Sequence, residues 1–153
     1  MIIYVDADAC PVKEEVIKIA SRHKIQVFIV SNGGIKIDPN PLINTIIVEN
    51  GLNVADKWIT SHVKYLDIVV TNDLPLASEA INLGAYAITP NGKELNSNNI
   101  GSILATRNLM EELRSANNFF QNKNKAFSRK DRSEFLNNLE KLIQKLKRYI
   151  LSE

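Results

Sequence analysis

The sequence has a single cysteine, Cys10, in 153 residues, so it cannot form an internal disulfide. Its uninterrupted apolar runs cover a handful of residues, far short of the ~20 that a membrane-spanning helix requires. The N-terminus has no basic segment followed by an apolar stretch of signal-peptide length. We therefore expect a cytoplasmic protein with no membrane partner, which is long enough to bury a substantial core without disulfides.

The overall composition is ordinary, but the charge is unevenly distributed. Hydrophobic residues make up 44% and charged residues 24% of the chain, as is usual for globular proteins. Residues 1–100 contain 8 Lys/Arg and 11 Asp/Glu, a net charge of −3, whereas residues 101–153 contain 11 and 6, a net charge of +5. This polarity would allow phosphate-binding cations to lie beside an acidic pocket, although by itself it favours a solvated helix face.

The first hundred residues alternate short β-branched runs with longer helical patterns. The spacing predicts strands at 2–6, 25–31, 45–48, 67–71 and 85–88, and helices at 11–23, 53–65 and 74–83. Strands that alternate with helices favour a parallel sheet with right-handed crossovers. The glycines and prolines of residues 32–44 predict a loop between the second and third strands.

The strand pattern ends after residues 90–92, and the rest of the chain is predicted to be helical. We expect helices at about 98–115 and from near Lys130, separated by a polar, basic loop near 116–130 that is the best candidate for mobility. Ser128 and Asp131 have the spacing of a capping box at the start of the last helix. We expect one domain over 1–153, with an α/β body at 1–95 and C-terminal helices at 96–153.

Four aspartates follow predicted strands at points where the chain turns into a helix. Asp6 and Asp8 end the first strand, Asp73 follows the fourth, and Asp56 lies in the first turn of the helix after the third. Parallel strands deliver these positions to one sheet edge, where open α/β sheets bind their ligands. Carboxylate oxygens suit Mg²⁺ or Mn²⁺. The alternative is that these residues serve only as helix caps and first-turn acids.

Four other residues of the sequence bear on the chemistry expected at this edge. Asp67 begins the strand that Asp73 follows, about 15 Å away at 3.3 Å per residue, and should be structural. Lys13 and Arg107 could reach the acidic pocket and bind phosphate, or they could be solvated surface residues. Cys10 lies at a helix start, but we expect a small packed residue there and not a nucleophile.

Several segments together resemble a known family along nearly the whole chain. They are Val5-Asp-Ala-Asp-Ala-Cys-Pro11, Val54-Ala-Asp56, the stretch 67–77, Pro90-Asn-Gly92, Arg107, Arg114, and Ser128-Arg-Lys-Asp-Arg132 with Phe135. In this order they resemble the YaiI/YqxD family of uncharacterised bacterial proteins. That family is similar to PIN-like domains, a superfamily of metal-dependent nucleases with a parallel sheet and clustered acids.

The resemblance implies a three-layer PIN-like α/β fold, with a mostly parallel sheet of about five strands flanked by helices. It also implies an acidic cluster lined by Thr71 and Asn72 and formed by Asp6, Asp8, Asp56 and Asp73. The chain departs from the family pattern at Asn53, where Asp is common. It departs again at 116–127, where Asn, Gln and Lys replace a Gly-Gly-Pro stretch.

Three functional hypotheses follow. The first is a Mg²⁺- or Mn²⁺-dependent phosphodiesterase acting on nucleic acid, with RNA favoured. The second is a haloacid-dehalogenase-like phosphatase with Asp6 as nucleophile and Lys57 or Lys64 as its lysine. In this chain, however, Ala-Cys-Pro follows the aspartate pair, where those enzymes have Gly and Thr or Val. The third is a non-catalytic module that binds nucleic acid or protein through its basic C-terminal third. Oligomeric state is not predicted.

Overall fold

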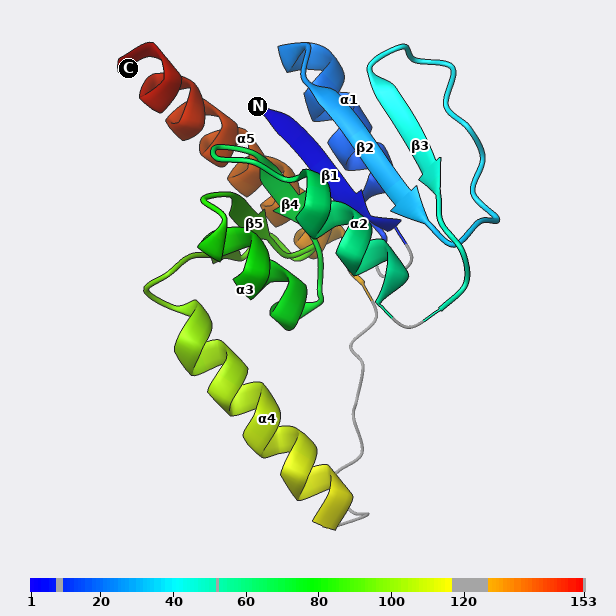
Figure 1. The fold of residues 1–153 in the computed structure, drawn as a ribbon. Coiled ribbons are helices and arrows are strands. Elements are labelled where there is room, and N and C mark those ends of the chain that lie inside the picture. The colour runs from blue at the N-terminus through cyan, green and yellow to red at the C-terminus, as the bar shows by residue number, and fades with distance from the viewer. Residues whose placement is uncertain (8–9, 52, 117–126, 153) are drawn as a thin grey trace.

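The computed structural model describes residues 1–7, 10–51, 53–116 and 127–152, which form a six-stranded sheet and five helices (Figure 1). The strands are β1 (Ile2–Asp6), β2 (Gln26–Ser31), β3 (Ile43–Ile47), β4 (Ile68–Val70), β5 (Tyr86–Ile88) and β6 (Glu94–Leu95). The helices are α1 (Lys13–His23), α2 (Val54–His62), α3 (Leu74–Asn82), α4 (Ile100–Ala116) and α5 (Arg129–Ser152).

The sheet has the order β3-β2-β1-β4-β5-β6, and all neighbouring pairs are parallel except β5 and β6. The chain builds outward from β1 to β3 on one side and then crosses back to β4 on the other. Such a reversal leaves a crevice beyond the carboxyl ends of the two central strands. Here these strands are β1, which ends on Asp6, and β4, which is followed by Thr71.

Side chains alternate between the two faces of the sheet, and each face carries its own helices. Val5 and Ile29 belong to a core that they share with α1 and α5. Tyr4 and Val69 belong to a second core, which they share with α2 and α3. Figure 1 shows α2 and α3 in front of the sheet and α5 behind it. Because Asp6 is two residues from Tyr4, the period of two places it on the α2 and α3 face.

The C-terminal helix is fixed to the body at its first turn. Ser128 Oγ accepts from Asp131 N–H at 3.1 Å and Asp131 Oδ2 accepts from Ser128 N–H at 3.0 Å, which confirms the predicted capping box. Arg132 then donates to the Pro11 carbonyl at 3.1 Å and to Glu15 Oε1 at 2.7 Å. The start of α5 is thereby tied to the start of α1.

The mixed α/β architecture agrees with the prediction, and two details differ. β3 begins at Ile43 rather than at residue 45. β6 was not expected, because Glu94–Leu95 carries too short a pattern to be recognised and forms by pairing back onto β5. The predicted mobile loop lies largely at 117–126, outside the described residues. Of the helices described, none combines the length and the apolar character needed to cross a membrane.

Candidate functional site at the carboxyl edge

Asp6 lies at the carboxyl end of β1 and is held by the neighbouring strand. It is 7% exposed, and its Oδ2 accepts a hydrogen bond from Thr71 Oγ1 at 3.0 Å. The same hydroxyl oxygen accepts from Asp73 N–H at 2.9 Å. Thr71 therefore links the end of β1 to the turn that leads from β4 into α3.

Asp73 and Asp56 come from two different helices and meet beside Asp6. Asp73 is the N-cap of α3, and its Oδ1 accepts from Leu76 N–H at 3.1 Å. Asp56 lies in the first turn of α2 and hydrogen bonds to the Asp73 side chain. Two carboxyl groups can share a hydrogen bond only if one of them holds a proton. The predicted convergence of Asp6, Asp56 and Asp73 at one sheet edge is thus present.

The electrostatic result of this convergence is clear at Asp56. Partial burial, the hydrogen bond and charge of Asp73, and the charges of Asp6 and Glu79 raise the pKa of Asp56 from 3.8 to about 7. This carboxyl group therefore holds its proton to a much higher pH than an ordinary aspartate does, although it is only partly buried.

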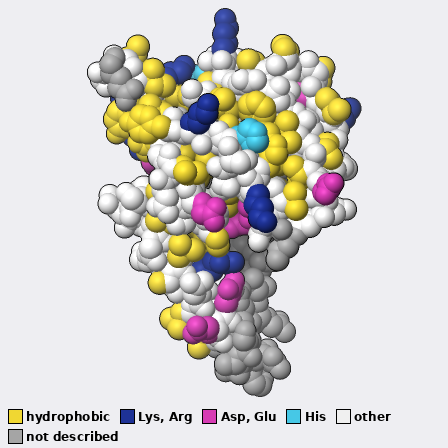
Figure 2. All heavy atoms as spheres, viewed as in Figure 1, with side chains coloured by type: hydrophobic (Ala, Val, Ile, Leu, Met, Phe, Trp, Pro, Cys, Tyr) yellow, Lys and Arg dark blue, Asp and Glu magenta, His cyan; other side chains and the backbone are white. Residues whose placement is uncertain are grey.

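A hollow of about 180 Å³ between α2 and α3 is lined by Asp56 but not by Asp73 or Asp6. Asn53, Asp56, Lys57 and Glu79 line it together with Leu76. Figure 2 shows acidic side chains with a basic one beside them over α2 and α3. Glu79 was missed in the sequence. Glu79 lies three residues after Leu76 and therefore on the same face of α3. The sequence alone could place Glu79 beside Asp56 only if this face were already known to pack against α2.

The donor atoms present suit a divalent cation, but the side chains are not arranged as a complete binding site. Carboxylate oxygens are the ligands that Mg²⁺ and Mn²⁺ prefer, and a cation would offset the repulsion that raises the pKa of Asp56. Among the described residues, however, no group of three His, Cys, Asp or Glu side chains could hold a metal ion as it stands. Asp8, the fourth predicted ligand, lies outside the described residues.

Asp67 occupies the opposite edge of the sheet, as expected of a structural residue. It is 4% exposed, its Oδ1 accepts from Ile2 N–H at 2.9 Å, and its Oδ2 accepts from Lys64 N–H at 2.9 Å. These bonds fix the start of β1 against the turn that precedes β4. Asp67 therefore does not join the acidic cluster.

The predicted phosphate-binding residues lie in different places. Lys13 lines a pocket between α1 and residues 36–39, on the other face of the sheet. Arg107 pairs with Glu111 of its own helix at 3.2 Å, and α4 extends away from the body (Figure 1). Asn72 is exposed beside Thr71. Of these residues only Asn72 is adjacent to the acids, and whether any of them binds substrate stays a prediction.

Cys10 is a packed residue. Its Sγ lies 3.4 Å from the Val70 carbonyl oxygen, to which it donates. Burial, followed by the negative charge of Asp6, raises the pKa of the Cys10 thiol far above its ordinary value. A thiol held in its protonated form is a poor nucleophile, which agrees with the expectation from sequence.

The order of the strands and the acids at their carboxyl ends define an α/β protein with a doubly wound sheet and an acidic edge. The chain belongs to the family described as "Uncharacterized BCR, YaiI/YqxD family", whose model matches residues 4–145. This confirms the resemblance seen in the sequence. No solved structure matches the chain.

Related proteins carry the same family name and no stated activity. A UPF0178 protein of Roseobacter denitrificans is 48% identical over 143 residues, which cover 94% of this chain and 95% of the relative. One from Rhodopseudomonas palustris is 48% identical over 146 residues, 95% of this chain and 92% of the relative. One from Azorhizobium caulinodans is 49% identical over 146 residues, 95% of this chain and 91% of the relative.

Proposed function

We propose that this protein is a divalent-metal-dependent phosphodiesterase that cleaves nucleic acid, with RNA as the favoured substrate. The supporting observation is the meeting of Asp56 and Asp73 beside Asp6, which raises the pKa of Asp56 to about 7. Repulsion between these acids costs stability, and a cation bound between them would offset that cost. Helix capping accounts for Asp73, and the dipole of α2 favours an acid at Asp56, but neither effect explains why these two side chains meet beside Asp6.

In this proposal the acids hold Mg²⁺ or Mn²⁺, and Asp8 completes the set formed by Asp6, Asp56 and Asp73. A bound ion of this kind would supply activation of water and stabilisation of the oxygen that leaves phosphorus. The chain's own contribution is positional. Thr71 fixes the orientation of the Asp6 carboxylate through its hydroxyl, and the α3 N-terminus fixes Asp73 through Leu76 N–H.

The phosphatase alternative receives less support. It requires Asp6 to attack phosphorus directly, but Asp6 is 7% exposed and its Oδ2 is engaged by Thr71. Lys57 does line the hollow beside Asp56, so the lysine that such an enzyme needs is present there. A beryllofluoride adduct on Asp6 would favour this alternative over the nuclease.

The test is cleavage of a labelled single-stranded RNA with Mg²⁺ or Mn²⁺, repeated in EDTA. Asp73→Asn keeps an N-cap, because Asn caps helices as well as Asp does, so the variant should fold. We expect it to lose at least about a hundredfold in rate, since loss of residues that merely support metal ligands already costs 10- to 100-fold. Asp56→Asn should behave in the same way.

Glu134→Gln is the matched control. Glu134 is an exposed residue of α5, which packs on the other face of the sheet from α2 and α3. The control should therefore keep wild-type cleavage. Activity that persists in EDTA or in Asp73→Asn would overturn the proposal. RNA binding that requires neither metal nor Asp6 would point to the non-catalytic module.

A further inference from the structure

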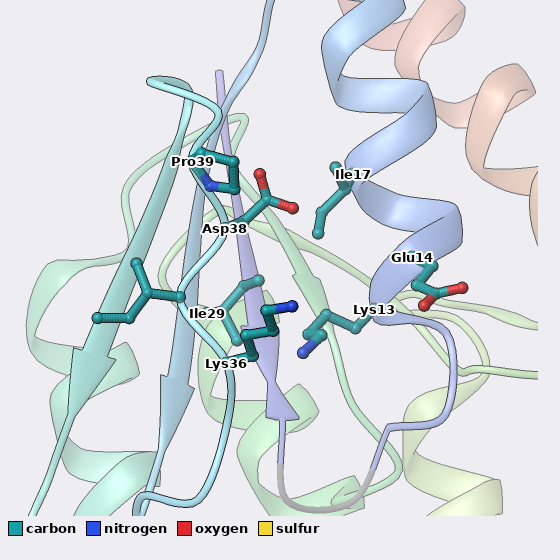
Figure 3. A pocket seen from close by; sticks show the side chains of 8 residues that line it. Lys13, Glu14, Ile17, Ile29, Lys36, Asp38 and Pro39 are labelled. Atoms are coloured by element: carbon teal, nitrogen blue, oxygen red, sulfur yellow. The ribbon is translucent and has the colours of Figure 1, made fainter.

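A second cavity lies on the opposite face of the sheet from the hollow between α2 and α3. It has a volume of about 230 Å³ and is enclosed by the first turns of α1, by β2 and by residues 36–39. Ile17 and Ile29 form apolar walls, and Lys13 and Lys36 extend into it from two sides (Figure 3). We call it the lysine pocket.

The two lysines meet without an acidic partner. Over the described part of the chain, neither Lys13 nor Lys36 forms an ion pair. Two acids also border the pocket. Asp38 accepts from Asn40 N–H at 2.8 Å and its carboxylate lies toward Ile17, whereas Glu14 points away from the cavity (Figure 3). The two ammonium groups therefore lie at the end of the pocket away from the Asp38 carboxylate.

An anion would be favoured at this end of the pocket. Lys13 is the first residue of α1, where the helix dipole disfavours a cation. Lys36, which has a charge of the same sign, lines the same cavity. Two ammonium groups match a phosphomonoester, which carries about −1.5 to −2 at pH 7, better than a phosphodiester with its single charge.

The register of the sheet places the lysine pocket close to the acidic edge. Asp6 pairs with Val30, and Ile29 of the pocket wall is the next residue back along β2. A strand spacing of about 4.8 Å and a rise of about 3.3 Å place the backbones of Asp6 and Ile29 about 6 Å apart. Their side chains point to opposite faces. A ligand that follows the end of β1 around the sheet edge would reach both sites.

We propose that the lysine pocket binds the terminal phosphomonoester of a nucleic-acid chain and so fixes where that chain lies relative to the carboxylates. The identity of the chain as nucleic acid rests on the proposed function. The phosphate group itself is inferred from the charge and place of Lys13 and Lys36. Ile17 and Ile29 would contact the sugar or base attached to it.

The test compares the affinity of the full-length protein, in EDTA, for three short single-stranded RNAs: 5′-phosphorylated, 3′-phosphorylated and unphosphorylated. We expect one phosphorylated RNA to bind about tenfold to a hundredfold more tightly than the unphosphorylated one. Lys36→Ala, at an exposed position that should not affect folding, and Lys13→Gln should each abolish this preference. Lys18→Ala, an exposed lysine of the same helix, should retain it.

Equal affinity for the three RNAs, or a preference that survives in Lys36→Ala, would overturn the proposal. The same RNAs separate this failure from failure of the proposed function. Cleavage that depends on Asp73 without any phosphate preference would keep the nuclease and refute the pocket. A phosphate preference that depends on Lys36, in a protein that cleaves nothing, would keep the pocket and refute the nuclease.

Discussion

Aspartate residues have opposite electrostatic surroundings at the two edges of the central sheet. At the amino edge, Asp67 is buried alone and receives two backbone N–H groups. At the carboxyl edge, Asp56 and Asp73 share a hydrogen bond beside Asp6, and the pKa of Asp56 rises to about 7. One edge satisfies a single charge with donors, whereas the other gathers charges that repel one another.

This difference separates structural acids from candidate functional ones by their surroundings. An acid that accepts hydrogen bonds from the backbone stabilises the fold, because it satisfies N–H groups that would otherwise lack an acceptor. An acid whose pKa is raised by its neighbours, as at Asp56, opposes folding near neutral pH and is therefore a candidate for a functional role. Asp67 and Asp73 flank the same strand, β4, and the end of the strand at which each lies separates the two kinds.

The largest effect is expected at the amino edge. Asp67→Ala leaves the N–H groups of Ile2 and Lys64 without their acceptors, and each such loss costs about 1–3 kcal/mol. We expect the free energy of unfolding to fall by about 3 kcal/mol, as measured by urea denaturation. Asp38→Ala, which loses one local bond, should cost less than half as much. Equal losses in the two variants would contradict the structural role of Asp67.

At the carboxyl edge a divalent ion should have the opposite effect and stabilise the protein. At a Mn²⁺ or Mg²⁺ concentration ten times the dissociation constant, binding to the native state adds about 1.4 kcal/mol to the free energy of unfolding. We expect a rise in the thermal midpoint for the wild type at pH 8 and little change for Asp73→Asn. An equal rise in both proteins would place the ion elsewhere.

The repulsion also makes stability depend on pH. Because the pKa of Asp56 is higher in the folded state than its ordinary 3.8, protonation favours the fold. That contribution is complete below pH 4 and is lost as the pH rises through about 7. Since Asp56 is partly exposed, solvent screening reduces the difference between wild type and Asp56→Asn to the order of 1 kcal/mol.

Urea denaturation of the two proteins between pH 5 and 8, without divalent ions, measures this difference. We expect Asp56→Asn to gain on the wild type as the pH rises. A difference that stays constant over this range would mean that Asp56 is not held in a repulsive cluster.

Sequence reasoning found the acids because it required only the order of elements. β-branched runs predicted β1 to β5 to within two residues, and a parallel sheet brings the carboxyl ends of these strands together regardless of packing detail. Glu79, Lys36 and the direction of Arg107 could not be predicted in this way. Their surroundings depend on how α2 packs on α3, how residues 32–42 cross the sheet, and where α4 leads from the body.

Glu79 gives the smallest expected effect and the sharpest check on the carboxyl edge. Its charge is the last of the contributions that raise the pKa of Asp56, and its side chain is exposed to solvent. Glu79→Gln should lower that pKa slightly and stabilise the protein by about 0.3 kcal/mol at pH 8, as is typical of exposed charges.

At pH 5, where Asp56 is already protonated, this gain should vanish. A gain of the same size at both pH values would show that Glu79 acts independently of the acid pair. Glu134→Gln on α5 is the control, because Glu134 lies by Lys130 on its own helix at 3.9 Å, and it should show no such pH-dependent gain.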